Sequence, residues 1–426
     1  MKNLQMQNVA QGPEKAILVG VEWRGNRIWD LESSIEELLE LVDTAGARVV
    51  ATLLAKIDKP TPTYFIGSGK ANELAALTQE SGADLIVFDD DLSPAQSRNL
   101  EKISKVRVID RTQIILDIFS RRARTKEAQF QVELAQLRYL LPRLTGQWMH
   151  LSRQEGGVGT RGPGETQLEV DRRRAKTRIL KLEKELKAIT SERETQRKRR
   201  EKTGVPLVSI MGYTNAGKTT LFNRLTTSRN LAEDRLFATL DATVRKKELE
   251  GHRIVLFSDT VGFIRKLPHH LVESFKATLE EVIHSDLLIH VVDISDPLYQ
   301  EKHAVVLQVL GKLGAESISR MTVLNKIDLL EGPERILRWE RGGEKVIPLS
   351  AQSGQGVDSL LAGVSEFFKK SFVRMKVFIP HQANDWVSFL YREAHVIKKK
   401  YEENGAFLEI EISSHLVSKI LPFQIS

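Results

Sequence analysis

The chain has 426 residues, of which 41% are hydrophobic and 28% charged. These proportions are typical of folded soluble proteins, and the length predicts about three domains. The absence of cysteine excludes disulfides, cysteine nucleophiles and thiolate metal sites. The N-terminus lacks the apolar core of a signal peptide, and no apolar run is long enough to span a membrane. We therefore expect a cytoplasmic protein without a membrane span.

Positive charge is concentrated in one segment. Lys and Arg number 63 against 56 Asp and Glu, a net charge of +7. Residues 171–202 alone hold 14 basic and 6 acidic residues, a local net of +8, so the rest of the chain is near −1. A solvated helix face is one explanation, but such a localised excess favours a nucleic acid or ribonucleoprotein partner.

Residues 1–112 are predicted to form an N-terminal α/β domain, because apolar β-branched runs alternate with segments of helical spacing. The expected strands are residues 16–21, 49–54, 85–88 and 106–109, and the expected helices are residues 35–42, 71–79 and 94–103.

Residues 113–202 are predicted to form a basic helical hairpin. Apolar residues repeat at helical spacing before and after the glycine-rich loop GGVGTRGPGETQLEVD, and Pro142 should end the first helix. Glycine and arginine at the tip of an antiparallel hairpin suit close approach to RNA phosphates. The predicted RNA contacts are Arg153, Arg161, Arg172, Arg173 and Arg174.

Residues 203–371 are predicted to form a doubly wound α/β domain, and residues 372–426 a small α/β domain. The expected strands of the larger domain are residues 207–211, 254–257, 287–292, 322–324 and 346–349. In the smaller domain we expect a strand at 376–379, a helix carrying Trp386, Phe389, Leu390, Ala394 and Ile397 on one face, and a strand at 407–412.

The segment GYTNAGKT matches the full phosphate-binding loop pattern, between an expected strand and an apolar helix pattern. Backbone N–H groups and the helix N-terminus would bind phosphates, Lys218 would contact the β and γ phosphates, and Thr219 would coordinate Mg²⁺. The predicted nucleotide-binding residues of this loop are Gly212, Tyr213, Thr214, Asn215, Ala216, Gly217, Lys218 and Thr219.

Two further segments are expected to sense the γ-phosphate. DTVG follows an expected strand and supplies Asp259, Thr260, Val261 and Gly262. FATLDAT, from Phe237 to Thr243, should cover the nucleotide and needs one threonine that responds to Mg²⁺. Thr239 and Thr243 both qualify, and their spacing does not distinguish them.

Guanine specificity is predicted from NKID, which supplies Asn325, Lys326, Ile327 and Asp328. A carboxylate at Asp328 can accept two hydrogen bonds from guanine, whereas adenine presents an acceptor and would leave it unpaired. SAQ, which supplies Ser350, Ala351 and Gln352, should offer backbone N–H groups to the guanine carbonyl. These motifs indicate a GTPase.

Phe263 follows DTVG at the position where Ras-type GTPases carry a water-orienting glutamine. A phenyl ring can neither donate to nor accept from that water. We expect slow intrinsic hydrolysis and stimulation by a partner, unless a nearby backbone group or cation positions the water unaided.

Over essentially its whole length, the chain resembles the HflX family of translation-associated GTPases. The resemblance is carried by GGVGTRGPGETQLEVDRR, GYTNAGKT, FATLD, DTVGFI and NKID. It implies Mg²⁺-dependent GTP hydrolysis stimulated by the ribosome, binding to the large subunit or assembled ribosome including rRNA, and splitting of stalled or idle ribosomes under stress. We expect the active form to be monomeric.

The resemblance also implies that Thr239 is the Mg²⁺-linked threonine and that Phe237, Ala238, Thr239, Leu240 and Asp241 form the covering switch. The residues expected to act on GTP are then Lys218, Thr239 and Gly262. Ala242 departs from the proline common in the family, which would loosen this loop.

Two alternative functions remain. The protein could be a ribosome assembly checkpoint GTPase, or an RNA-remodelling NTPase that uses the N-terminal domain. Only the weak GSGK loop at residues 67–70 could support the second.

Overall fold

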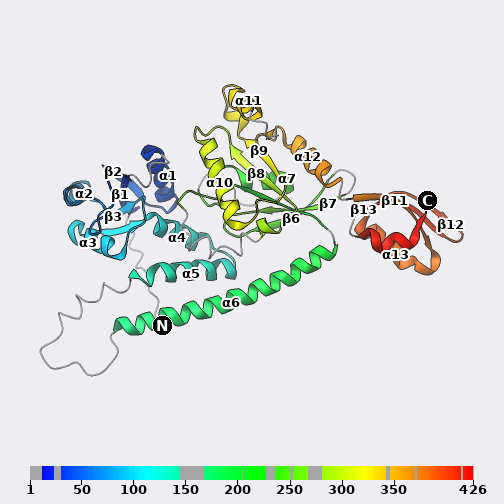
Figure 1. Cartoon of the computed structure of the whole chain (residues 1–426), viewed down its shortest axis with the longest axis horizontal. Coiled ribbons are helices and arrows are strands. Elements are labelled where there is room, and N and C mark those ends of the chain that lie inside the picture. Colours follow the sequence, from blue (N-terminus) through cyan, green and yellow to red (C-terminus); the bar gives the residue numbers. More distant parts are fainter. Residues whose placement is uncertain are drawn as a thin grey trace. The chain divides into compact units, whose positions relative to one another are not determined.

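The computed structural model describes residues 12–23, 30–143, 167–203, 205–226, 236–249, 253–266, 281–341, 346–369, 372–413 and 416–425. These residues form two compact units. Figure 1 labels the helices and strands of both. The first contains the described residues up to Lys187 together with residues 236–237, and the second contains the others.

The first unit contains a parallel sheet of order β2-β1-β3-β4. Its strands are β1 (Lys15–Glu22), β2 (Arg48–Lys56), β3 (Leu85–Phe88) and β4 (Arg107–Asp110), and its helices are α1 (Leu31–Thr44), α2 (Ser68–Ser81) and α3 (Pro94–Ser104). These elements confirm the predicted alternation. β3 is buried throughout, as expected for a central strand of a parallel sheet. Ser93 and Gln96 form a capping box that begins α3.

Three helices follow this sheet: α4 (Arg111–Arg122), α5 (Lys126–Leu140) and α6 (Gln167–Thr203). The predicted domain boundary at 112/113 falls inside α4, and the domain limits stay a prediction. α5 ends two residues before Pro142, as expected.

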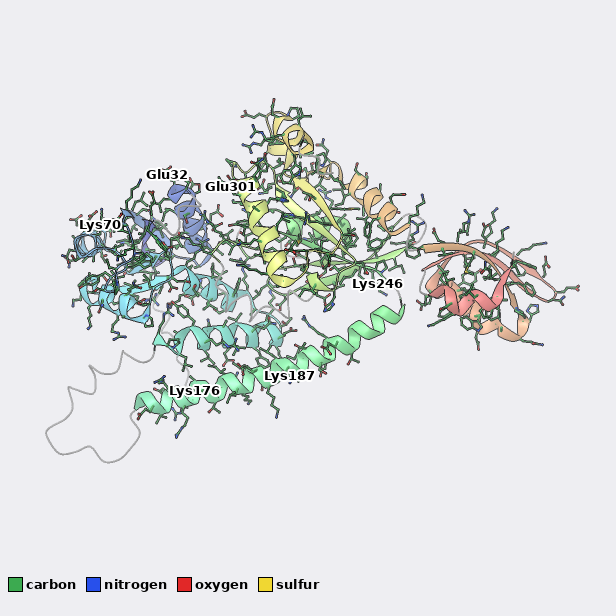
Figure 2. The ribbon with its side chains drawn as sticks, in the orientation of Figure 1. Glu32, Lys70, Lys176, Lys187, Lys246 and Glu301 are labelled. Carbon is green, nitrogen blue, oxygen red and sulfur yellow. The ribbon has the colours of Figure 1, made fainter. Side chains whose placement is uncertain are left out.

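α6 packs beside α5 (Figure 1). Arg178 forms a bidentate pair with Glu133, with both N–O distances 2.6 Å. Leu182 of α6 is fully buried, whereas Lys176 and Lys187 project into solvent from the same helix (Figure 2). No helix in the described part of the chain is long and apolar enough to cross a membrane.

The second unit contains a six-stranded sheet of order β10-β9-β8-β5-β7-β6. Its strands are β5 (Leu207–Gly212), β6 (Thr243–Glu248), β7 (Ile254–Asp259), β8 (Leu287–Asp293), β9 (Arg320–Asn325) and β10 (Val346–Pro348), and its helices include α7 (Lys218–Thr226), α10 (Tyr299–Leu313), α11 (Glu334–Arg341) and α12 (Val357–Lys369). The strands predicted here are all present. The sequence prediction missed β6, the antiparallel edge strand, because TVRKKE has no apolar run.

A second sheet of this unit has the order β12-β13-β11-β14 and is antiparallel. Its strands are β11 (Phe372–Pro380), β12 (Ala394–Glu402), β13 (Gly405–Ser413) and β14 (Gln424–Ile425). The helix α13 (Asn384–Glu393) lies between β11 and β12 in the chain. The predicted helix was too long. Ala394 and Ile397 lie in β12 instead, because cross-strand pairing with β13 replaces the helical hydrogen bonds after Glu393.

One bidentate ion pair joins the two sheets of the second unit. Arg253, just before β7, donates to both carboxylate oxygens of Glu411 in β13, at 3.0 and 2.5 Å. Both side chains are largely shielded from solvent, so this pair gives more geometric specificity than an exposed one.

Candidate nucleotide-binding site

The loop between β5 and α7 requires glycine at two positions. A Cβ on Gly212 would lie 2.2 Å from the Val291 carbonyl oxygen, and one on Gly217 would lie 2.2 Å from Asn325 Nδ2. Gly217 also has a φ of +88°, which side-chain-bearing residues rarely adopt. The backbone of β8 therefore requires glycine at 212, and the Asn325 side chain together with the positive φ requires it at 217.

Lys218 lies buried at the start of α7. Its Nζ donates to the Tyr213 carbonyl oxygen at 2.6 Å, and burial lowers the pKa of Lys218 to about 8. A Cβ on Gly262 would lie 2.9 Å from the same Nζ. The fold therefore brings together the loop lysine and the glycine of DTVG, two residues that the sequence predicted to act on the γ-phosphate.

Three oxygen-bearing side chains meet beside Lys218. The Thr219 and Thr239 hydroxyls are 2.7 Å apart, and each donates to Asp259 Oδ2 at 2.9 Å. The other carboxylate oxygen, Asp259 Oδ1, is buried without a hydrogen-bond partner among the described residues. Burial raises the pKa of Asp259, while nearby Lys218 opposes that shift. This is a hard-oxygen cluster with unused acceptor capacity, which fits Mg²⁺.

Thr243, the other candidate, has a different place. It begins β6 and lies opposite Asp259 in the β6–β7 ladder. Thr239 is the threonine whose hydroxyl reaches both Thr219 and Asp259. The geometry thus favours the threonine that the family resemblance indicated, although its role stays a prediction.

Phe263 is buried and its backbone is bonded to the phosphate-binding loop. The Phe263 N–H donates to the Gly212 carbonyl at 3.1 Å, and the Thr214 N–H donates to the Phe263 carbonyl at 2.7 Å. Two residues on, the Arg265 N–H donates to the Tyr213 hydroxyl at 2.9 Å. The Phe263 side chain is 1% exposed and has no hydrogen-bonding group, so it cannot orient an attacking water. The role of the Tyr213 hydroxyl was not apparent from the motif.

Asn325 connects two loops of the predicted guanine site. Its Nδ2 donates to the Ala216 carbonyl at 2.8 Å, and its Oδ1 accepts from the Ala351 N–H at 2.9 Å. Lys326 pairs with Asp293 at 2.8 Å, whereas Asp328 is exposed. The structure therefore brings NKID and SAQ to the same edge of the sheet.

Arg224 supports the SAQ loop and was missed by sequence reasoning. Its guanidinium donates to the Ala351 carbonyl at 3.3 Å and also to the Gln352 carbonyl. Nothing in the sequence distinguishes this arginine from a solvated residue at the end of α7. Only the tertiary contact reveals it as a positioning residue.

The remaining predicted residues are dispersed. Thr260 donates through its hydroxyl to the Ile210 carbonyl at 2.7 Å, which is a structural contact. Phe237 belongs to the first unit, where its ring packs edge to face on Phe119 at 4.7 Å. The covering segment predicted from 237 to 241 is therefore divided between the units. Buried residues within it include Leu240, while Ala238 and Asp241 are half-buried.

The predicted RNA contacts are only partly described. Arg172, Arg173 and Arg174 are exposed on the first turns of α6. Arg153 and Arg161 lie outside the described residues.

A phosphate-binding loop at a strand–helix junction, an adjoining lysine and hydroxyl–carboxylate cluster, and an NKID loop at the same sheet edge define a P-loop GTPase. Family models match along the chain. They are "GTP-binding GTPase N-terminal" at residues 32–120, "GTP-binding GTPase Middle Region" at 122–200, "50S ribosome-binding GTPase" at 207–326 and "HflX C-terminal domain" at 336–419.

Curated relatives match this chain over nearly its full length. The chain is 44% identical to GTPase HflX of Caldanaerobacter subterraneus over 422 residues, covering 99% of this chain and 96% of that one. It is 45% identical to GTPase HflX of Escherichia coli, covering 92% of each. The chain therefore belongs to the HflX family of GTPases. Among solved structures, it is similar to a GTP-binding protein of Sulfolobus solfataricus in complex with GDP, at 25% identity and a TM-score of 0.44, covering 84% of this chain and 99% of that one.

Proposed function

We propose that the site binds GTP with Mg²⁺ through the residues brought together around Lys218. The observation that carries the proposal is the contact of the Thr219 and Thr239 hydroxyls with Asp259, whose Oδ1 has no partner among the described residues. Thr219 and Thr239 would hold the metal, with Asp259 behind them. When bound, Mg²⁺ neutralises charge on the β and γ phosphates.

GTP would act as a conformational ligand. Thr239 and Gly262 contact the phosphate-binding loop in different ways. The Thr239 hydroxyl contacts the Thr219 hydroxyl, and Gly262 packs closely on Lys218. A γ-phosphate would order both segments, and its loss would release them. Asp328 and the SAQ backbone would select guanine. Because Phe263 is buried, the chain's own residue at that position cannot orient water, so we expect a partner to stimulate hydrolysis.

The large ribosomal subunit is the proposed partner. Support comes from the family model described as a 50S ribosome-binding GTPase and from the basic segment at residues 171–202. The exposed Arg172, Arg173 and Arg174 would contact rRNA phosphates, with Arg153 and Arg161 probing rRNA from the loop tip. In this proposal, a cytoplasmic monomer binds stalled or idle ribosomes under stress and separates their subunits. Binding energy would drive the separation, and hydrolysis would release the protein.

The decisive measurement is GTP hydrolysis with and without mature large subunits, together with sedimentation of intact ribosomes. We expect stimulation by subunits, and ribosome separation with a non-hydrolysable GTP analogue. Separation with GTP but not with the analogue would contradict the proposed use of binding energy. Binding only to immature particles would instead indicate an assembly checkpoint.

Deleting residues 156–164 tests the loop. The proposal expects loss of ribosome separation with GTP binding retained. Arg161→Ala should weaken separation in the same direction, whereas Lys102→Ala, an exposed change on α3, serves as its control. Loss of GTP binding in the loop variants would contradict an RNA-probing role.

A further inference from the structure

The C-terminal antiparallel sheet has two chemically different faces. Val377, Ile379 and Leu408 belong to an apolar core with Leu390 of α13. The alternate residues lie on the opposite face of the sheet. We define the outer face by Arg374, Lys376, Phe378, Lys398, Lys400, Glu402, Phe407 and Glu409.

Two phenyl rings lie side by side on this outer face. Phe378 of β11 is directly opposite Phe407 of β13, with ring centroids 4.6 Å apart and an interplanar angle of 47°. Both are only partly buried. A Cβ on Gly405 would lie 2.8 Å from Phe378 Cζ, so the glycine leaves room for that ring to lie against the strand. The rings are therefore held in place before any ligand arrives.

Cations surround the aromatic pair. Lys400 is opposite Phe407, and Lys398 and Lys376 flank Glu409 in the next row of the sheet. The outer face thus holds four cations against Glu402 and Glu409, while Glu411, which also lies on this face, is paired with Arg253. Lys398 pairs with Glu409 and Lys400 pairs with Glu402, but the two lysine side chains are 79% and 76% exposed. Exposed pairs of this kind are weak and leave the ammonium groups available to another anion.

We propose that the outer face binds single-stranded RNA. Unpaired bases stack on exposed aromatic rings, and lysines beside the rings neutralise the phosphates that connect those bases. A duplex keeps its bases stacked inside the helix and could not use the rings. The proposal is independent of the ribosome as a partner and assigns the C-terminal sheet an RNA contact separate from α6.

The test uses the full chain and a fluorescein-labelled uridine 12-mer, measured by anisotropy at about 50 and about 300 mM salt. High salt weakens phosphate contacts more than stacking, which suppresses the contribution of α6. Phe378→Leu with Phe407→Leu should weaken binding about tenfold at the higher salt. The matched control replaces another exposed aromatic pair of the same domain, Tyr391→Leu with Tyr401→Leu, whose hydroxyls are 3.4 Å apart away from the outer face. The control should change binding less than about twofold.

Crosslinking of a 4-thiouridine 12-mer locates the contact. The proposal expects crosslinked peptides from β11 and β13. Crosslinks confined to α6, or equal affinities for the phenylalanine variant and the parent, would overturn it. If the phenylalanine variant unfolds, Lys376→Glu with Lys400→Glu decides, because both side chains are exposed. Unchanged RNA binding in that variant, even with weakened binding to another protein, would overturn the RNA assignment.

Discussion

The four-stranded parallel sheet and the mostly parallel six-stranded sheet both place charged side chains after the carboxyl ends of their strands, with different results. In the first unit, Arg111 pairs with Asp89 at 2.7 Å and with Glu37, while Asp110 accepts from Tyr139 at 2.8 Å and from Arg143 at 2.9 Å. Each charge there has an opposite or hydrogen-bonding group of the protein itself.

At the corresponding edge of the six-stranded sheet, the charged groups are not fully paired within the protein. Lys218 is buried and donates to the Tyr213 carbonyl oxygen, and Asp259 retains an oxygen without a hydrogen-bond partner among the described residues. Burying polar groups without full pairing costs free energy, so such a site gains stability when a ligand supplies the missing contacts. Position at a sheet edge is thus shared by both clusters. They differ in their buried carboxylates: Asp89 and Asp110 pair with arginines, whereas Asp259 Oδ1 has no hydrogen-bond partner among the described residues.

The strongest test of this contrast is Lys218→Ala. Removing one partner of a buried charge contact should weaken GTP binding by about 10³-fold, or about 4 kcal/mol. Titration with a fluorescent GTP analogue measures the loss, and Lys312→Ala, an exposed change at the end of α10, is the control. ATP turnover surviving in the Lys218 variant would instead support a second nucleotide site.

The corresponding change at the structural cluster is Arg111→Met. It leaves Asp89 and Glu37 buried without their shared cation, so we expect the first unit to lose about 3–5 kcal/mol of stability. Hydrogen exchange of β3 and β4 amides measures this loss. The same substitution at Arg107, whose pair with Glu14 is exposed on both sides, should cost less than about 1 kcal/mol. Equal effects would remove the distinction drawn here.

Thr239→Ala, in the loop before β6, and Thr243→Ala, at the start of β6, form a matched pair of variants. Loss of the Thr239 hydroxyl removes a contact to Thr219 and Asp259, so stimulated hydrolysis should fall about tenfold or more, at least ~1.4 kcal/mol in the barrier. Thr243→Ala should have a much smaller effect. Single-turnover hydrolysis across a Mg²⁺ titration provides the measurement, and a larger defect in Thr243→Ala would reassign the switch threonine.

The smallest expected effect concerns pH. Burial, with His303, Arg320 and Lys218 nearby, holds the pKa of His290 well below its usual range. The unfolded chain takes up this proton below about pH 6.5 while the folded chain does not, so stability falls as pH decreases through that value, by about 1.4 kcal/mol at pH 5.5. His290→Leu should flatten this slope, whereas His381→Leu at an exposed position should not. Urea unfolding followed by tryptophan fluorescence at pH 7.5 and 5.5 compares the two variants. An unchanged pH dependence in His290→Leu would exclude His290 as its source.

Much of this fold was predictable because its signals are local. The strand at β3 and the helix α3 follow from an apolar run and a Ser93-Pro94 start, and the phosphate-binding loop follows from glycine spacing next to a strand. β6 was not predictable, since an edge strand needs only one apolar face. The end of α13 was also misjudged, because Ala394 and Ile397 continue the helical spacing although both lie in β12, where Ala394 pairs with Ile412 of β13.

Within the candidate site, local sequence determined the residue types and their order, since backbone turns around phosphates demand glycine, lysine and hydroxyls at set spacings. Tertiary structure decided which of those groups meet. Contacts between residues far apart in the chain bring Thr239 to Asp259, 20 residues away, and Arg224 to the SAQ loop, 127 residues away. Such contacts depend on how strands and helices pack, so no spacing along the chain encodes them.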